Sequence, residues 1–254
     1  MAYNSPEFDL SAYNPKDPWQ FPPNRMVVFA IDAMALFQRS RTKMIPRGKI
    51  HPDLRFTFFH EAISICHPIM SLGLLLRDPG QKVEWWHAQP EFKKEYKERT
   101  VQSFNMNLRG AGMSSLINGI LGLTEATLRQ MLWHLDPKAP ENTQGFRPVW
   151  KYMLENYEGM RYEPAIKLLL VLRDSAIYGG KFCSKLRQNL EIRFQRKDLL
   201  FENNEEFDVT KFGYLDDWEF LFELLKEIND LFNALFDHPE IMAKHRMPAR
   251  AYEE

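Results

Sequence analysis

The chain has little cysteine, almost no net charge, and neither an internal repeat nor a low-complexity block. Its only cysteines are Cys66 and Cys183, too few for a disulfide framework or for a zinc site built from thiolates. A net charge of -1 excludes the strongly basic overall field by which many proteins attract nucleic acid. No basic residue precedes Lys16 and no apolar run opens the chain, so we expect no secretory signal.

Long hydrophobic runs are lacking as well. The most apolar stretches, such as Met113 to Leu123 and Ala165 to Leu172, are too short to span a bilayer. What is present is typical of a folded globular protein, because 44% of the residues are hydrophobic and 13% are aromatic. These features predict a cytoplasmic protein without membrane contact, folded as one large or two small domains.

Residues 1–24 differ in composition from the rest of the chain. They carry five prolines, a density that denies the hydrogen bonds of helices and sheets, and we predict an extended arm. The arm is rich in aromatic residues, which are Tyr3, Phe8, Tyr13, Trp19 and Phe21. Two interpretations stay open: the rings pack on the protein's own surface, or the arm binds a protein partner.

The remainder of the chain is predicted to be mostly helical from its hydrophobic periodicity. The predicted helices cover Met26 to Phe37, Pro52 to Arg77 with a kink at Pro68, Glu91 to Arg99, Val101 to His134, Phe146 to Tyr157, Glu163 to Tyr178, and Leu215 to Phe236. The last is the clearest amphipathic helix, with a stripe made of Leu215, Trp218, Leu221, Phe222, Leu225, Ile228, Phe232 and Leu235. The fold class is therefore all-α.

Four local features complete this prediction. Arg39 to Lys43 begins a basic loop, and Phe182 to Leu190 adds one more helical turn. A short β-hairpin follows, because Ile192 to Phe194 and Leu199 to Phe201 have strand character. The helix from Val101 contains Gly110, Gly112, Gly119 and Gly122, which indicates close packing against another helix.

The segment Arg173-Asp174-Ser175-Ala176-Ile177-Tyr178-Gly179-Gly180 is the one place where the sequence suggests chemistry. An apolar run ends in Arg173, and Tyr178 follows five residues later. Residues five apart in a helix lie about 140° apart around its axis, so both long side chains can reach round a groove toward one ligand. The two glycines then break the helix and let a backbone or a substrate come close.

This segment resembles the signature of the HEPN superfamily, the compact helical domains that include many RNases of toxin, antiphage and RNA-processing systems. Arg173 matches the family's arginine, Asp174 stands where asparagine is common, and Gly179 with Gly180 match its small residues. Tyr178 stands where the catalytic histidine should be. The resemblance covers residues 99–236, and residues 25–98 would be an N-terminal helical extension and residues 237–254 a C-terminal tail.

The resemblance implies a compact helical bundle with its site in a groove, commonly between the protomers of a homodimer, and no metal or cofactor. In the family's RNases the arginine holds the phosphate, and the histidine moves protons while the ribose 2′-hydroxyl attacks. A tyrosine has an ordinary pKa of about 10, too high for a general base at neutral pH. It can still hydrogen-bond a phosphate or stack on a base.

We therefore expect a degenerate site, formed by Arg173 and Tyr178, that binds RNA, a nucleotide or a protein partner in an antiviral defence or toxin–antitoxin setting. An active metal-independent endoribonuclease is the alternative, using Arg173 with Tyr178 or with a histidine from elsewhere in the fold. A third hypothesis is a non-enzymatic assembly protein that makes contacts through the arm and the acidic helix from Leu215 to Phe236.

Further candidate binding residues surround this segment. They are Asp174, Gly180, Lys181, Lys185, Arg187 and, by its approximate position in the preceding long helix, Glu125. A basic cluster runs from Lys181 to Lys197, and an acidic run follows it to Asp208. The basic cluster either attracts RNA or pairs with the acidic run across the hairpin.

A second string with the family's spacing occurs at Arg55 and His60, but it lacks the polar residue after the arginine and the small residues after the histidine. We predict a structural role for it, and it is the fallback if an active site exists. His60, Ser64 and His67 share one helical face, yet two histidines without a third ligand do not predict a metal site.

Overall fold

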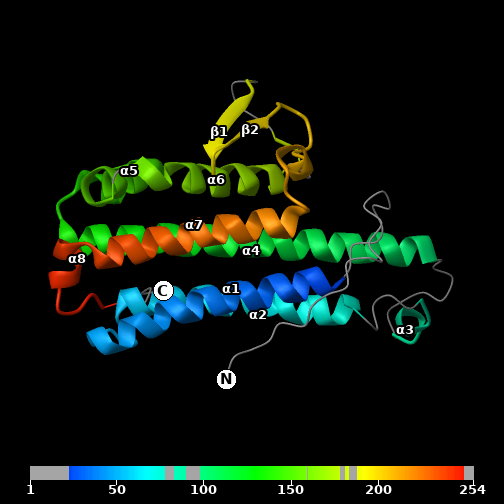
Figure 1. Ribbon diagram of the computed structural model, residues 1–254, viewed down its shortest axis with the longest axis horizontal. Coiled ribbons are helices and arrows are strands. Elements are labelled where there is room, and N and C mark those ends of the chain that lie inside the picture. The colour runs from blue at the N-terminus through cyan, green and yellow to red at the C-terminus, as the bar shows by residue number, and fades with distance from the viewer. Residues whose placement is uncertain are drawn as a thin grey trace.

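The computed structural model describes residues 23–77, 83–89, 98–158, 160–177, 181–182 and 188–248. Within these ranges the chain is mostly helical with one two-stranded antiparallel sheet, which agrees with the predicted all-α class and its single hairpin. The long helices run along the long axis of the molecule, and the hairpin stands beside them (Figure 1). The predicted arm lies outside the described residues except for Pro23 and Asn24, as does the helix from Glu91 except for its last two residues.

The elements follow one another along the chain with short connections. The helices are α1 (Pro23–Met44), α2 (Leu54–Arg77), α3 (Val83–His87), α4 (Glu98–Leu135), α5 (Phe146–Tyr157), α6 (Glu163–Ile177), α7 (Asp217–Asp237) and α8 (Pro239–Ala243). The strands are β1 (Leu190–Phe194) and β2 (Lys197–Phe201). Short 3-10 helices cover Ile45–Arg47, Pro140–Thr143, Met160–Tyr162 and Val209–Phe212.

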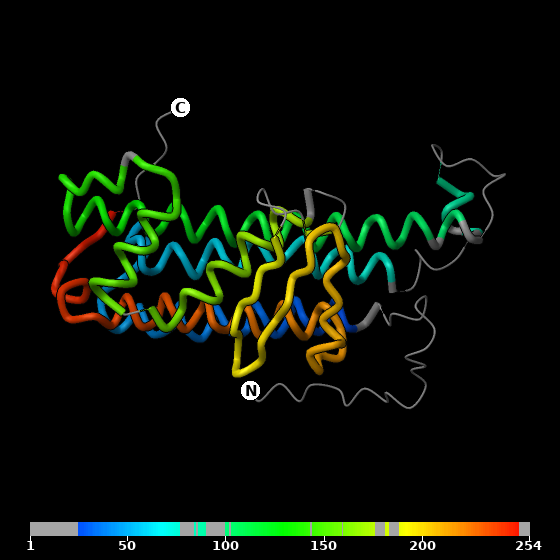
Figure 2. The backbone as a smooth tube through the Cα atoms, turned by 90° about the horizontal axis from the view of Figure 1, so that it is seen from above, coloured from blue at the N-terminus to red at the C-terminus, as the bar shows by residue number. Residues whose placement is uncertain are grey.

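The long helices form three layers in Figure 1, with α5 and α6 in one outer layer, α4 and α7 in the middle, and α1 and α2 in the other outer layer. Figure 2 shows the bundle from above, where α4 runs along one edge and α1 and α7 run along the opposite edge. Buried hydrophobic side chains from Met26 to Met247 form one core cluster. Residues 25–98 and residues 99–236 therefore share a core.

Helix α7 confirms the predicted amphipathic stripe, because Trp218, Leu221, Ile228 and Phe232 are among its buried side chains. Its N-cap is Asp216, whose side chain accepts a hydrogen bond from the backbone N–H of Glu219 (2.9 Å). The prediction was wrong for Leu215, which precedes the helix and is 62% exposed. Since the apolar face of α7 lies in the core, only its acidic edge is left for the contacts of the assembly hypothesis.

Two of the four glycines of α4 confirm the predicted close packing. A Cβ atom at Gly112 would lie 2.9 Å from Leu72, and one at Gly119 would lie 2.9 Å from Ile65, so both glycines let α2 approach α4. The prediction was wrong for Gly110 and Gly122, because a Cβ atom at either would meet nothing within 4 Å.

Helix α1 continues to Met44, so the predicted loop from Arg39 to Lys43 is helical, which corrects the prediction. No glycine or proline interrupts the pattern before Pro46, and Gly48 then ends the following turn with a left-handed backbone (φ 68°). Helix α2 runs through Pro68 to Arg77, as predicted.

Helix α2 is also the most apolar element. From Leu54 to Leu76 it is long enough and apolar enough to cross a membrane, with a mean hydropathy of 1.3, which corrects the prediction that the chain has no such stretch. Core helices of soluble proteins meet the same criterion, and α2 packs against α4 and, through Gly73 and Val27, against α1.

The hairpin confirms the predicted strands, with Leu190 opposite Phe201 and Phe194 opposite Lys197. The prediction of an additional helical turn before the hairpin is wrong at Phe182. The backbone N–H of this residue donates to the carbonyl of Glu205 (3.1 Å) and not to a carbonyl one turn earlier. Residues 188 and 189 are not helical either, and residues 183–187 lie outside the described part of the chain.

Candidate functional site

Arg173 lies near the C-terminal end of α6, and its guanidinium pairs with the next residue. Its Nε and Nη2 atoms donate to Oδ1 of Asp174 (2.9 and 2.7 Å). The two side chains are 37% and 47% exposed. This is a local pair at the surface, which counts against a shared catalytic groove. Tyr178, Gly179, Gly180, Lys185 and Arg187 lie outside the described residues.

The other predicted residues around the segment are engaged locally. Glu125 accepts hydrogen bonds from Nε and Nη2 of Arg129 (2.9 and 2.7 Å), one turn further along α4. Lys181 is exposed and forms a backbone bridge with Glu206. Arg193 and Asp198 face each other across the hairpin at 3.8 Å, so at this point the basic cluster pairs with the acidic run.

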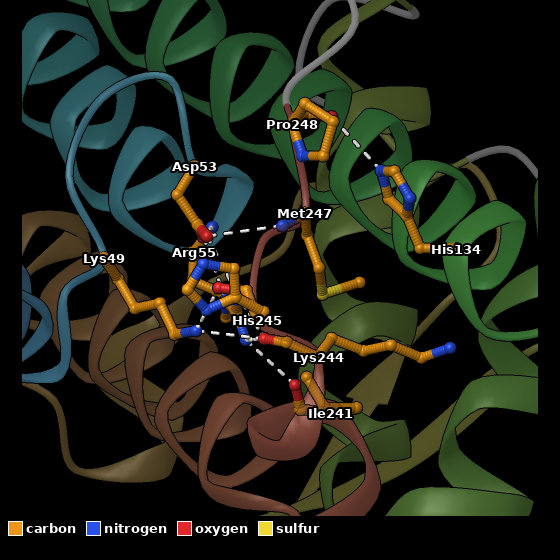
Figure 3. A network of polar contacts seen from close by, with 9 residues as sticks. All are labelled: Lys49, Asp53, Arg55, His134, Ile241, Lys244, His245, Met247 and Pro248. Atoms are coloured by element: carbon orange, nitrogen blue, oxygen red, sulfur yellow. Dashed lines mark hydrogen bonds and ion pairs between the residues drawn. The ribbon is translucent and has the colours of Figure 1, made fainter.

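Arg55 is 1% exposed and confirms the predicted structural role (Figure 3). Its Nε and Nη2 atoms donate to the two carboxylate oxygens of Asp53 (2.9 and 2.7 Å). Its Nη1 atom donates to the carbonyls of Ile241 (2.9 Å) and Lys244 (3.1 Å) at the end of α8. These bonds satisfy carbonyls that a helix C-terminus leaves without partners.

The same network, which we call the clasp, holds the segment after α8. Figure 3 shows the Nζ atom of Lys49 directed at the carbonyls of Lys244 (3.0 Å) and His245 (2.8 Å). The backbone N–H of Leu54 donates to the carbonyl of Met247 (2.7 Å). The clasp consists of Lys49, Asp53, Arg55 and residues 241–248, and it joins the start of α2 to the C-terminal segment.

Burial and the neighbouring charges shift the pKa values of two side chains in the clasp, those of Asp53 and Lys49. Burial alone would raise the pKa of Asp53, but hydrogen bonds from the side chain and backbone of Arg55 outweigh it, and the pKa lies below its ordinary value. Burial, with the nearby Arg55 charge, lowers the pKa of Lys49. The Asp53 carboxylate and the Arg55 guanidinium thus compensate each other inside the protein.

His60 does not face Arg55. Its partner is Arg41 of α1, whose Nη1 atom lies 2.9 Å from Nδ1 of His60. The Nη2 atom of Arg41 donates to Oε1 of Gln38 (2.5 Å), and the Nε2 atom of Gln38 donates to Oγ1 of Thr42 (3.3 Å). We call Gln38, Arg41, Thr42, Phe56 and His60 the Arg41 cluster.

Phe56 supports the Arg41 cluster from α2. The guanidinium carbon of Arg41 lies 5.6 Å from the centre of the Phe56 ring, and the His60 ring stacks on Phe56 with centroids 6.3 Å apart. Arg41 and His60 are both half-buried. Among the described residues, no carboxylate forms an ion pair with either side chain.

The contact with Arg41 sets the hydrogen-bonding role of Nδ1 in His60. An arginine is always protonated in proteins and can only donate, so Nδ1 of His60 must accept, and the ring carries its proton on Nε2. The donors that these hydrogen bonds do not use are the Nε2–H of His60, the remaining guanidinium N–H groups of Arg41 and one side-chain N–H of Gln38. The spare hydrogen-bonding capacity is therefore mainly that of donors, which suits an oxyanion.

Sequence patterns alone did not point to the Arg41 cluster. Arg41 and His60 lie on different helices, and the five-residue spacing paired His60 with Arg55 instead. A usable signal was the run from Arg39 to Lys49, which holds five basic residues and no acidic one.

Possible metal ligands and the thiol of Cys66, within the described residues, are not arranged for chemistry. Among the described residues, no three His, Cys, Asp or Glu side chains lie close enough together to hold a metal ion. Cys66 is buried in the core, and burial raises the pKa of its thiol to about 12, which suppresses the reactive thiolate.

No family model, no curated protein and no solved structure matches this chain.

Proposed function

We propose that this protein binds a phosphate-bearing ligand, a nucleotide or RNA, at the Arg41 cluster. One observation carries the proposal: an arginine donates to a histidine ring nitrogen without a carboxylate partner on either side chain among the described residues. Two basic side chains in direct contact leave donors without matching acceptors, and phosphate oxygens supply those acceptors.

The surroundings of the Arg41 cluster favour an anion. Arg39 and Lys43 are exposed in the last turns of α1, two residues before and after Arg41, and the helix directs them away from it. Lys49 is committed to the clasp, and Arg47 pairs with Asp237, so these two cations have carbonyl or carboxylate partners. The end of α1 still has a positive local potential, because Arg39 to Lys43 contains three cations and no acidic residue, although the whole chain has a net charge of -1.

The tautomer of His60 supports binding over cleavage. A histidine acts as a general base through a ring nitrogen that has a lone pair. In the Arg41 cluster the lone pair of Nδ1 is used by Arg41, and Nε2 carries the proton. His60 can then donate to a phosphate oxygen but cannot accept the proton of a ribose hydroxyl in this state.

The test is a titration with inorganic phosphate, AMP and a short fluorescent RNA, using Arg41→Ala and His60→Ala. Each lost charge-assisted hydrogen bond is worth about 1.5–3 kcal/mol, so we expect Kd to rise roughly 10- to 100-fold in either variant. Tight binding of AMP with weak binding of RNA would identify a nucleotide site, and the reverse would identify RNA.

Arg47→Ala is the matched control, because this arginine lies near Arg41 in sequence but pairs with Asp237. Equal loss of binding in all three variants would show a diffuse basic surface and contradict the proposal. No binding of any of the three probes would also contradict it. Cleavage of RNA in EDTA that depends on His60 would show that the Arg41 cluster catalyses a reaction and does not only bind its ligand.

A second candidate is the HEPN-type fold with its site at Arg173. The observation in its favour is the exposure of the Arg173–Asp174 pair, because an incoming phosphate could replace the single Asp174 carboxylate. In that case Arg173→Ala would weaken RNA binding while Arg41→Ala would not. The same titration therefore separates the two sites.

A further inference from the structure

Helix α4 presents an exposed face without charge. From Thr100 to Thr124 the only charged residue is Arg109. Six exposed residues of this stretch fall within an arc of about 80° around the helix axis, given 3.6 residues per turn. They are Phe104, Asn107, Ala111, Ser115, Asn118 and Gly122, which we call the α4 face.

Two residues of the α4 face, Phe104 and Gly122, lower the stability of the single chain. Phe104 packs one side against Trp86, with ring centroids 5.7 Å apart, and is still 43% exposed. Gly122 has nothing within 4 Å of where its Cβ would be, although glycine inside a helix costs about 1 kcal/mol relative to alanine. Among the residues that the structure describes, Ile65 accounts for Gly119, but no such neighbour accounts for Gly122.

The α4 face is complementary to itself. Phe104 and Gly122 lie nine residues on either side of Met113, and Ala111 and Ser115 lie two residues on either side. Asn107 and Asn118 are six and five residues away from it. Two antiparallel copies of α4 with a two-fold axis at Met113 would set Phe104 against Gly122, Asn107 against Asn118, and Ala111 against Ser115.

We propose that a second copy of this chain docks on the α4 face, with the two α4 helices antiparallel. Each pairing then has a physical reason: a large ring fills the space above a glycine, two amides can exchange hydrogen bonds, and two small side chains let the backbones approach. This interface does not include Arg173 of α6, and it does not depend on the Arg41 cluster.

The area available suits a weak, reversible dimer. Helix α4 runs along one edge of the bundle (Figure 2), and the 19 residues of the α4 face span about 27 Å at 1.5 Å per residue. The exposed edge of α2 from Ser64 to Ser71 adds a second helix width over about 10 Å. The footprint is then roughly 370 Å² per copy, or about 740 Å² in total, which is the size of a weak or transient interface.

A lipid surface fits the α4 face less well. Asn107, Ser115 and Asn118 make half of it, and their polar groups lose hydrogen bonds to water when they enter hydrocarbon. The face also lacks the lysines and arginines that border membrane-binding helices. Between two copies, the same polar groups can bond each other.

The first experiment measures the association of the full chain by sedimentation equilibrium, for the natural sequence, Gly122→Leu and Gly110→Leu. Gly110 is also open and exposed but lies about 100° away from the middle of the α4 face, so it is the matched control. We expect a dimer for the natural chain and Gly110→Leu, and a monomer for Gly122→Leu. Circular dichroism should show intact helices in both variants, because the space at each glycine is open.

The second experiment tests the antiparallel register with charges. Asn107→Lys combined with Asn118→Lys would place like charges opposite each other and should abolish the dimer. Asn107→Glu combined with Asn118→Lys would place opposite charges together and should retain it. A natural chain that is monomeric at every concentration tested, or a dimer that withstands Gly122→Leu and the double lysine variant, would overturn the proposal.

Discussion

Arg55 and Arg41 lie fourteen residues apart in the chain but in opposite surroundings. Arg55 is buried, and all three of its guanidinium nitrogens donate to the Asp53 carboxylate or to backbone carbonyls. Arg41 is half-buried, donates to a ring nitrogen and an amide oxygen, and has no carboxylate partner among the described residues. The same residue type therefore serves as a structural clasp in one place and keeps unused donors in the other.

This difference separates an arginine with a structural role from one that we propose as a binding residue. In the clasp, donors and acceptors match, and removal of either partner leaves a buried group without compensation. In the Arg41 cluster the donors exceed the acceptors, and water can reach the surplus. Substitutions at both positions test whether the two arginines differ as much in energy as they do in geometry.

The largest effect is expected from Arg55→Ala. The substitution leaves the Asp53 carboxylate buried without its partner and frees the carbonyls of Ile241 and Lys244, so the free energy of unfolding should fall by about 3–5 kcal/mol. Urea unfolding followed by circular dichroism measures it. Arg47→Ala removes an exposed pair with Asp237 and should cost less than about 1 kcal/mol. Equal losses in the two variants would contradict the role of the clasp.

Much of the fold could be predicted from the sequence, because helix α5 and the hairpin depend on local patterns that the sequence shows directly. The end of α1 was missed because basic residues suit a helix C-terminus as well as a loop. The Arg41 cluster could not be predicted, since its geometry depends on how α1 packs on α2. The spacing of Arg55 and His60 was visible, but the partner of each side chain is set by tertiary contacts.

Arg55→Lys should have the next largest effect. Lysine keeps the charge but cannot reproduce the planar fork that contacts both oxygens of Asp53 and two backbone carbonyls, so we expect a loss of roughly 2 kcal/mol in the free energy of unfolding. Arg41→Lys is the comparison, and it should leave the stability unchanged within about 0.5 kcal/mol. A loss as large for Arg41→Lys would mean that both arginines act as structural clasps.

The clasp should make its own contribution to the pH dependence of stability. The pKa of Asp53 is lower in the folded protein than its ordinary value, so its stabilisation is present above the unfolded pKa of about 4 and is lost as pH falls through the lower folded value. The stability difference between the natural chain and Asp53→Asn should therefore shrink on acidification below about pH 4. A difference that stays constant down to the lowest pH at which the chain folds would contradict this assignment.

The smallest effect on stability is expected from Arg41→Ala. Both Arg41 and His60 are half-buried, so water can replace the lost bond at Nδ1 of His60, and the free energy of unfolding should change by less than about 0.5 kcal/mol. The same variant should lose at least about tenfold in affinity for phosphate. Unfolding and binding measured on one preparation give both numbers. If Arg41→Ala instead destabilises the fold as much as Arg55→Ala, Arg41 is a structural residue and the proposed phosphate site is wrong.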